Sequence, residues 1–273
     1  MRVVYQYFLE GAPTVARRLD FPILFSVATV RRHHPDAEVV VLDYSGGRLD
    51  WGDFPDRLGF RTVPKALDST RAADFFPVHI HRPRHVWEEA AGPTVYTDCD
   101  VLWLEPLPGL DPGVVHIHEK NGGFFAFDPA CYRAAAFLGL WAHACDLADR
   151  DPEFRRAVRV NEHDTWLHDE SVYRHLWRVY PELLAPWVRH TPPELLAHPW
   201  DLPLARAGRF HMTMPHCGPR RGALAWLLRE TQPTIERMFN NNELESMLGE
   251  LHPLGGRYSC ATLADAVARV NPP

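Results

Sequence analysis

An alternation of strand, helix and strand at the start of the chain constrains the fold more than any other feature. Val3 to Leu9 is apolar and aromatic and predicts a first strand, and apolar residues then recur at helical spacing from Thr14 to His34. Pro35-Asp36 ends that helix, and the valine-rich run from Glu38 to Tyr44 predicts a second strand. Because two strands joined by a helix form a unit with parallel strands, we expect an α/β fold with a mostly parallel central sheet flanked by helices.

The same patterns predict further elements along the 273 residues. We expect strands at Phe60 to Val63, Thr94 to Thr97, Val114 to His118, Gly123 to Phe127 and Arg209 to Met214. We expect helices at His81 to Ala91, Pro129 to Arg150 and Asp169 to Tyr180. No repeat or linker interrupts the chain, so the simplest partition is one domain over residues 1–230, followed by a helical C-terminal extension over residues 231–273.

Two carboxylates, Asp98 and Asp100, come directly after the strand predicted at Thr94 to Thr97. Residues two apart in an extended segment point to the same side, so both carboxylates can reach one ion. A second apolar run, Val101 to Leu104, follows, and charges between apolar segments are costly unless a positive group meets them. A divalent cation with oxygen ligands satisfies that requirement, and we predict a metal site here.

The Asp-x-Asp spacing alone is weak evidence, because about one such pair is expected by chance in a chain of this length. A second pair is indeed present in Asp149-Arg150-Asp151, within a polar stretch before Pro152. We interpret that pair as a solvated helix end. The position of Asp98 and Asp100 between two apolar segments distinguishes them from it.

Composition excludes several classes of function. The formal net charge of −6 leaves no general basic surface for nucleic acid. The five cysteines form no Cys-x-x-Cys pair, which excludes zinc-finger and disulfide-framework proteins. The N-terminus lacks the features of a signal peptide, and the longest apolar stretch, Phe21 to Val30, is too short to span a bilayer. We therefore expect a cytoplasmic protein with no transmembrane segment.

Five segments carry a resemblance to a known family. They are His34 to Glu38 before the second strand, Val95 to Leu102, Asn121 to Phe127, His168 to Glu170, and His211 with the loop His216 to Arg220. In this order they resemble GT-A-fold glycosyltransferases, and among them the glycogenin-like and bacterial lipopolysaccharide hexosyltransferase branch. The resemblance covers most of residues 1–230 and implies a nucleotide-diphospho-sugar transferase fold for that domain.

The resemblance also implies a metal cofactor, Mn²⁺ or Mg²⁺, which in the family is held by the Asp-x-Asp motif and bridges the donor diphosphate. Carried over, Asp98 contacts the ribose and is a candidate metal ligand, and Asp100 is the direct metal ligand. The cation would stabilise the charge that grows on the leaving diphosphate. A late histidine completes the coordination in relatives, and here His211 is the first choice and His216 the alternative.

The donor phosphates have candidate partners on both sides of the carboxylates. Relatives follow the late histidine with a glycine and a phosphate-binding lysine, and this chain has Gly218 and then Arg220-Arg221 near His216. Arginine also binds phosphate, but the spacing leaves open which arginine does so. Arg82 lies where relatives have a basic residue near the sugar and phosphates, and its alternative interpretation is a solvated charge on a helix.

The sugar has its own candidate residues. Asn121, Gly122 and Gly123 resemble the family segment that lines the sugar pocket, since glycine lets backbone approach a ligand closely, although a hairpin turn also explains them. Asp169 and Glu170 fall where relatives have Asp followed by Gln beside the reacting sugar, and we take them as catalytic candidates. The alternative is that both acids cap the N-terminus of a helix.

The base of the nucleotide is less constrained. Tyr5 or Tyr7, near the end of the first strand, could stack on it, although aromatic residues at such positions more often belong to the core. The acceptor is a carbohydrate, a lipid-linked molecule or a small molecule.

The sequence thus predicts a metal-dependent hexosyltransferase that uses a nucleotide-diphosphate sugar, UDP-linked in the first instance, and retains the configuration of the donor. Glu170 in place of the family's Gln leaves open an inverting reaction with a carboxylate as general base. Two rivals are a GT-A-like protein that binds sugar nucleotides without turnover and a haloacid-dehalogenase-type phosphatase. The phosphatase would need a downstream lysine, and Lys120 is too close to Asp98 to supply it.

Overall fold

The computed structural model describes residues 1–7, 21–66, 79–99, 101–118, 122–159, 167–192, 195–197, 210–212, 233–240 and 243. Its strands are β1 (Arg2–Tyr7), β2 (Glu38–Asp43), β3 (Phe60–Pro64), β4 (Thr94–Thr97), β5 (Val101–Trp103), β6 (Val115–Ile117), β7 (Phe124–Phe127), β8 (Val188–His190), β9 (Leu196–Ala197) and β10 (Phe210–Met212). Its helices are α1 (Phe21–His33), α2 (Phe54–Leu58), α3 (Arg82–Glu88), α4 (Tyr132–Arg150), α5 (Pro152–Arg159), α6 (Asp169–Val179) and α7 (Pro181–Leu184), with a 3₁₀ turn η1 (His79–His81) before α3.

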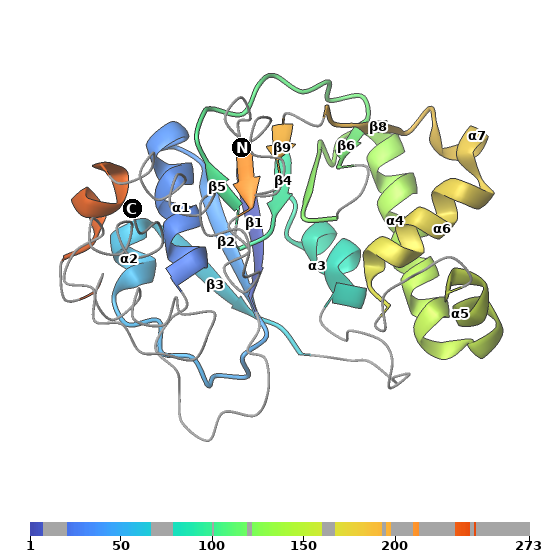
Figure 1. Ribbon diagram of the computed structural model, residues 1–273, viewed down its shortest axis with the longest axis horizontal. Helices are drawn as coiled ribbons and strands as arrows, with labels where there is room; N and C mark the ends of the chain where they lie inside the picture. The colour runs from blue at the N-terminus through green and yellow to red at the C-terminus, as the bar shows by residue number, and fades with distance from the viewer. Residues whose placement is uncertain are drawn as a thin grey trace, which may run out of the picture.

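The central sheet has seven strands in the order β3-β2-β1-β4-β7-β6-β8 (Figure 1). β1 pairs in parallel with β2 and β4, β2 with β3, and β6 with β8, whereas β7 is antiparallel to both of its neighbours. The expected mostly parallel sheet, including the unit β1–α1–β2, is therefore confirmed. β4 lies in the middle of the sheet, and the carboxyl ends of strands in such sheets are where ligands bind.

A second, three-stranded sheet has the order β5-β10-β9. β10 is antiparallel to β5, with His211 opposite Leu102 and Met212 opposite Val101. The strand expected at Arg209 to Met214 is thus confirmed over its middle residues. The pairing brings a late part of the chain beside the segment that directly follows Asp98-Cys99-Asp100.

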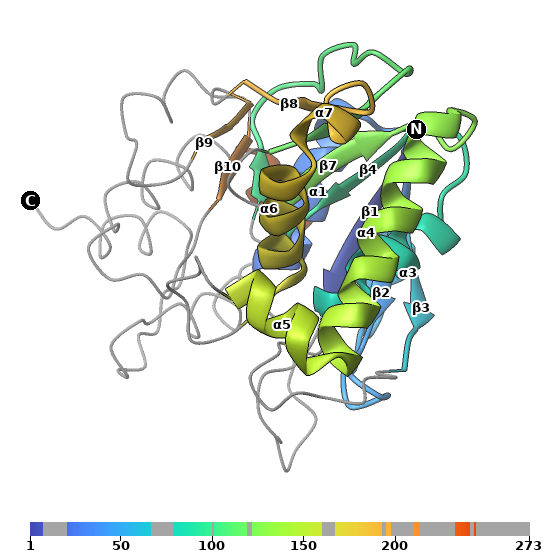
Figure 2. The same cartoon turned by 90° about the vertical axis from the view of Figure 1, so that its right-hand side faces the viewer.

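Two hydrophobic clusters cover the two faces of the central sheet. Side chains alternate between the faces along each strand, so Val3 and Tyr5 pack with α1 while Val4 packs with α4 and α6. Figure 1 shows α1 and α2 on one side and α3, α4 and α6 on the other, and Figure 2 shows α4 and α6 in front of the sheet. Trp141 is buried within the α4 layer and contacts Phe125 edge-on at a centroid distance of 5.4 Å.

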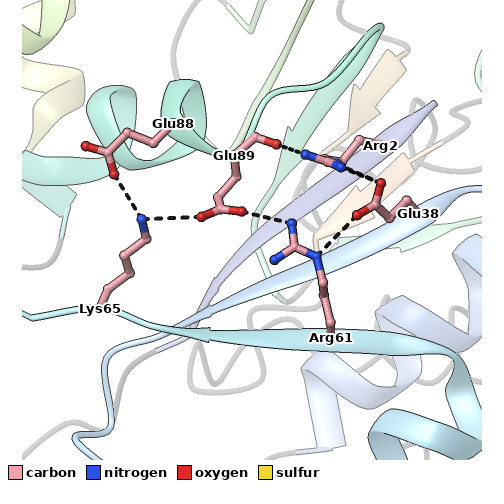
Figure 3. Close-up of polar contacts among 6 residues, drawn as sticks. All are labelled: Arg2, Glu38, Arg61, Lys65, Glu88 and Glu89. Carbon is pink, nitrogen blue, oxygen red and sulfur yellow. Dashed lines mark hydrogen bonds and ion pairs between the residues drawn. The ribbon is translucent and has the colours of Figure 1, made fainter.

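A row of alternating charges, which we call the surface ion chain, ties α3 to the first three strands (Figure 3). Its members are Arg2, Glu38, Arg61, Lys65, Glu88 and Glu89. Arg61 contacts Glu38 at 3.2 Å and Glu89 at 2.9 Å. Lys65 contacts Glu88 at 2.9 Å and Glu89 at 3.4 Å. The surface ion chain holds the C-terminal end of α3 in place. Arg82 is the first residue of that helix.

The expectation of a solvated helix end at Asp149-Arg150-Asp151 is wrong for Asp149, which is 5% exposed. α5 begins immediately after α4 and folds back on it. Arg155 of α5 donates to the carbonyls of Ala148 at 2.8 Å and Asp149 at 2.6 Å, which covers the last turn of α4. Asp151 is exposed as expected, and its Oδ1 accepts the N–H groups of the first turn of α5.

Only a small part of the predicted C-terminal extension is described. Residues 233–238 are helical, and Ile235 and Phe239 are buried in the same cluster as α1. Among the described residues, no helix is long and apolar enough to cross a membrane.

Candidate active site

The carboxylate of Asp98 is anchored at the carboxyl end of β4. Its main-chain N–H donates to the carbonyl of Gly123 at 2.8 Å, which extends the pairing of β4 with β7. Its Oδ1 accepts hydrogen bonds from the hydroxyl of Tyr96 at 2.6 Å and from Nη1 of Arg82 at 3.3 Å. The side chain is 23% exposed, and Oδ2 has no hydrogen-bond partner among the described residues. Oδ1 of Asp98 is therefore fixed by the protein, and Oδ2 is available to a ligand.

Arg82 is not a solvated charge on a helix, which was its alternative interpretation. Its role near the sugar and phosphates of the donor stays a prediction. Its side chain is fully buried at the start of α3. Besides Asp98, the guanidinium donates to the carbonyl of Gly122 at 3.0 Å and to Oδ1 of Asp169 at 2.7 Å, and it lies 5.1 Å from the ring centroid of Tyr96. Arg82 is thus an internal counter-ion that joins β4, the turn before β7 and α6.

Asp169 and Glu170 open α6 as expected, but they do not cap it. The N-cap residue is His168, and the carboxylate of Asp169 turns away from the helix to Arg82. Asp169 has no exposed surface, whereas Glu170 is 22% exposed and lies 3.9 Å from Arg82 and 3.7 Å from Arg174. Of the two catalytic candidates, only Glu170 presents surface to a ligand in this structure.

The close approach expected at Gly122 is present, but the approaching group belongs to the protein. A Cβ atom at Gly122 would lie 2.9 Å from Cγ of Glu170, which is too close for any other residue. Gly122 and Gly123 also form the turn between β6 and β7, so the hairpin explanation holds as well. Asn121 lies outside the described residues.

The charges of this cluster are unbalanced, because the three carboxylates of Asp98, Asp169 and Glu170 face only two guanidiniums, the buried Arg82 and the partly exposed Arg174 at 3.7 Å from Glu170. Burial disfavours the charge on Arg82, yet the carboxylates, Asp169 foremost, outweigh it and hold its pKa well above its ordinary value. Burial raises the pKa of Asp169 to about 7, against the opposing effect of Arg82. Burial also raises the pKa of Glu170, opposed by Arg82 and reinforced by the charge of Asp98. The site therefore favours uptake of a proton or a cation.

The buried polar atoms of the cluster are incompletely satisfied. Within the described part of the chain, Oδ2 of Asp169 and Nε of Arg82 are buried without a hydrogen-bond partner. Such unpaired buried groups reduce stability, and they commonly mark sites kept for function.

The other predicted metal ligands are only partly visible. Asp100 lies outside the described residues, and of His211 only the backbone is described. That backbone lies opposite Leu102, two residues after Asp100, because β10 pairs with β5. Taken by themselves, the described residues contain no group of three or more His, Cys, Asp or Glu side chains that could hold a metal ion.

The remaining candidates are two tyrosines of β1 and three late residues. Tyr5 is fully buried, as its alternative interpretation as a core residue expects, and its hydroxyl pairs with that of Ser26 at 2.8 Å. Tyr7 is also buried, packed edge-on against Trp51 at 5.4 Å. The substrate-binding candidates His216, Gly218 and Arg220 lie outside the described residues.

Sequence reasoning missed Tyr96. It is 1% exposed and its hydroxyl makes the shorter of the two hydrogen bonds to Asp98. The available signal was its position two residues before Asp98 in a strand, which places both side chains on the same side.

Comparison with known proteins bears on the fold. No protein-family model matches the sequence, and no curated protein matches it. A crystal structure of the galactosyltransferase LgtC with donor and acceptor sugar analogues matches with a TM-score of 0.52 and 13% identity, over 86% of this chain and 95% of that one. A structure of an active-site mutant of LgtC matches with a TM-score of 0.52 and 13% identity, over 85% and 94% of the two chains.

These similarities show that the chain has the GT-A glycosyltransferase fold, as the sequence predicted.

Proposed function

We propose that the chain is a glycosyltransferase that moves a hexose from a nucleotide-diphosphate sugar, UDP-linked in the first instance, with the help of Mn²⁺ or Mg²⁺. One observation carries the proposal. On a GT-A fold, Asp98 leaves the central strand β4 with one oxygen available and is joined through Arg82 to Asp169 and Glu170 of α6. Carboxylates at the carboxyl end of a central strand are placed where α/β sheets bind ligands.

The residues fit a divalent cation. Asp98 and Asp100 supply carboxylate oxygens and His211 an imidazole, a donor set that Mn²⁺ accepts. The pairing of β10 with β5 brings the backbone of His211 beside the segment that begins after Asp100. The surplus of carboxylates over guanidinium supports the same conclusion, because a cation would relieve it. When bound, the cation would stabilise negative charge on the leaving diphosphate.

The chain's own side chains divide the remaining work. Arg82 orients Asp98 from inside the protein, so its second oxygen can contact the donor. Asp169 is fully buried behind Arg82 and acts through it as a positioning residue. Glu170 has exposed surface and lies against Gly122, which makes it the described carboxylate that can contact the sugar.

We further propose that the reaction retains the donor's configuration. In that mechanism the departing phosphate can take the acceptor's proton, so Glu170 need only orient the sugar. Its carboxyl group is partly exposed and can form a hydrogen bond with a sugar hydroxyl. The acceptor remains a carbohydrate, a lipid-linked molecule or a small molecule. The proposal includes a cytoplasmic setting, supported by Cys131 and Cys145, which form no disulfide within the described residues.

A screen of sugar nucleotides by thermal shift, with and without Mn²⁺, tests the proposal. We expect at least one UDP-sugar to raise the melting temperature in a concentration-dependent way, and Mn²⁺ to increase that shift. Mn²⁺-dependent release of UDP from the same donor would separate an enzyme from a protein that only binds sugar nucleotides. No shift with any UDP-, GDP-, ADP- or dTDP-sugar would contradict the proposal.

A further inference from the structure

We propose that Tyr96 is a positioning residue for Asp98: its hydroxyl fixes Oδ1 so that Oδ2 faces the donor and its cation. The inference rests on the proposed function and adds to it a residue that never touches the substrate. Tyr96 lies on β4 two positions before Asp98, and its hydroxyl donates to Oδ1 at 2.6 Å.

The ring of Tyr96 packs against two neighbouring side chains. It stacks on Phe125 of the neighbouring strand β7, with centroids 5.0 Å apart and an angle of 22° between the ring planes. The guanidinium of Arg82 lies 5.1 Å from its centroid. Because the side chain is only 1% exposed, these contacts and the strand backbone fix the direction of the hydroxyl. A buried hydroxyl also needs an acceptor, and Asp98 provides one.

The chemistry of the two donors to Oδ1 explains why a tyrosine is useful here. Arg82 brings a full positive charge, and part of that charge is already matched by Asp169 at 2.7 Å. The hydroxyl of Tyr96 is neutral, so it can orient the carboxylate without neutralising it. Asp98 thereby keeps its negative charge for a cation while its rotation is restrained.

The substitution Tyr96→Phe tests this role because it removes the hydroxyl and keeps the ring. We expect the dissociation constant for UDP in the presence of Mn²⁺, measured by calorimetry, to rise by about 10- to 100-fold, the range for losing a hydrogen bond to a charged group. Tyr173→Phe is the matched control. Tyr173 lies on α6 and is 2% exposed, but its hydroxyl pairs with Nε2 of His190 at 2.6 Å, on the edge strand β8 and three strands away from β4. That variant should lose comparable stability and bind UDP and Mn²⁺ like the wild type.

A second measurement checks the contact without any ligand. Because this hydrogen bond couples the two side chains, the losses in urea midpoint caused by Tyr96→Phe and Asp98→Ala should not add in the double variant. Additive losses, or equal affinity of Tyr96→Phe and Tyr173→Phe for UDP with Mn²⁺, would overturn the role of Tyr96. A wild-type chain that binds no UDP in the presence of Mn²⁺ would instead overturn the proposed function on which that role rests.

Discussion

Two clusters of charged side chains hold α3 in place, and they differ in balance and in burial. The surface ion chain alternates three cations, Arg2, Arg61 and Lys65, with three anions, Glu38, Glu88 and Glu89 (Figure 3). The cluster around Arg82 sets two guanidiniums, Arg82 and Arg174, against three carboxylates, and both Arg82 and Asp169 have no exposed surface.

The difference separates a structural role from a functional one. Exposed, balanced ion pairs contribute little each and tolerate change, since water and salt can replace either partner. A buried and unbalanced cluster costs stability, because desolvated charges remain without partners. Such a cluster is retained where its surplus charge is used, and here that charge lies at the carboxyl end of β4. The predictions below test whether the two clusters differ in this way.

The largest effect is expected from Arg82→Met, which leaves buried carboxylates without their counter-ion. We expect urea unfolding to show that the free energy of unfolding falls by about 3–5 kcal/mol. Arg61→Met is the matched control: Arg61 bridges Glu38 and Glu89 but is 43% exposed. The free energy of unfolding of Arg61→Met should be lower than that of the wild type by about 1 kcal/mol or less. This difference should become smaller when salt is added. Equal losses in the two variants would remove the distinction between the clusters.

A pH-dependent effect of similar size is expected at Asp169. Burial raises its pKa in the folded chain to about 7, above its value of about 3.9 in an unfolded chain. The folded state therefore binds the proton more tightly, so this group stabilises the fold below about pH 4, and that contribution is lost as the pH rises to about 7.

Asp169→Asn removes the titrating group. We expect wild-type stability to fall relative to the variant as the pH increases from about 4 to about 7, as measured by urea unfolding at several pH values. A wild type that instead gains stability relative to the variant over this range would show that Asp169 stays ionised beside Arg82.

The smallest effect is expected from Glu170→Gln. If Glu170 only orients the sugar, the variant should keep activity within about tenfold of the wild type, whereas loss of a general base costs about 10²- to 10⁴-fold. NMR assignment of the product anomer accompanies the rate measurement. A product with the opposite configuration to the donor, together with a nearly inactive variant, would replace retention by inversion.

The residues that were predicted from the sequence are those whose neighbours in the chain determine their surroundings. The run of valines predicted β2, and the apolar run before Asp98 predicted β4. Both are local signals, and both strands are present. The pairing of Arg82 with Asp169 was not predictable, because the two residues are 87 positions apart and meet only when α3 and α6 pack on the same sheet.

Two further side chains show the same limit. Asp149 was expected in solvent, but Arg155 of α5 folds back over the end of α4 and covers it. Tyr5 was considered for a ligand, but the hydroxyl of Ser26 on α1 satisfies its own. In each case the environment of the side chain is set by a residue from another helix or strand, and the sequence around the side chain does not indicate that residue.

The most direct test of the account is the Mn²⁺-dependent binding of UDP by wild type and by Asp100→Ala, measured by calorimetry. Asp111→Ala serves as control, because Asp111 is 44% exposed, pairs with Arg189 at 3.4 Å and accepts the main-chain N–H of Gly113 at 2.9 Å, with no link to Asp98 among these contacts. We expect wild type and Asp111→Ala to bind UDP more tightly with Mn²⁺ than without it, and Asp100→Ala to lose that difference while remaining folded. An Asp100→Ala variant that keeps the full Mn²⁺ dependence would show that the metal site lies elsewhere and would contradict the central claim.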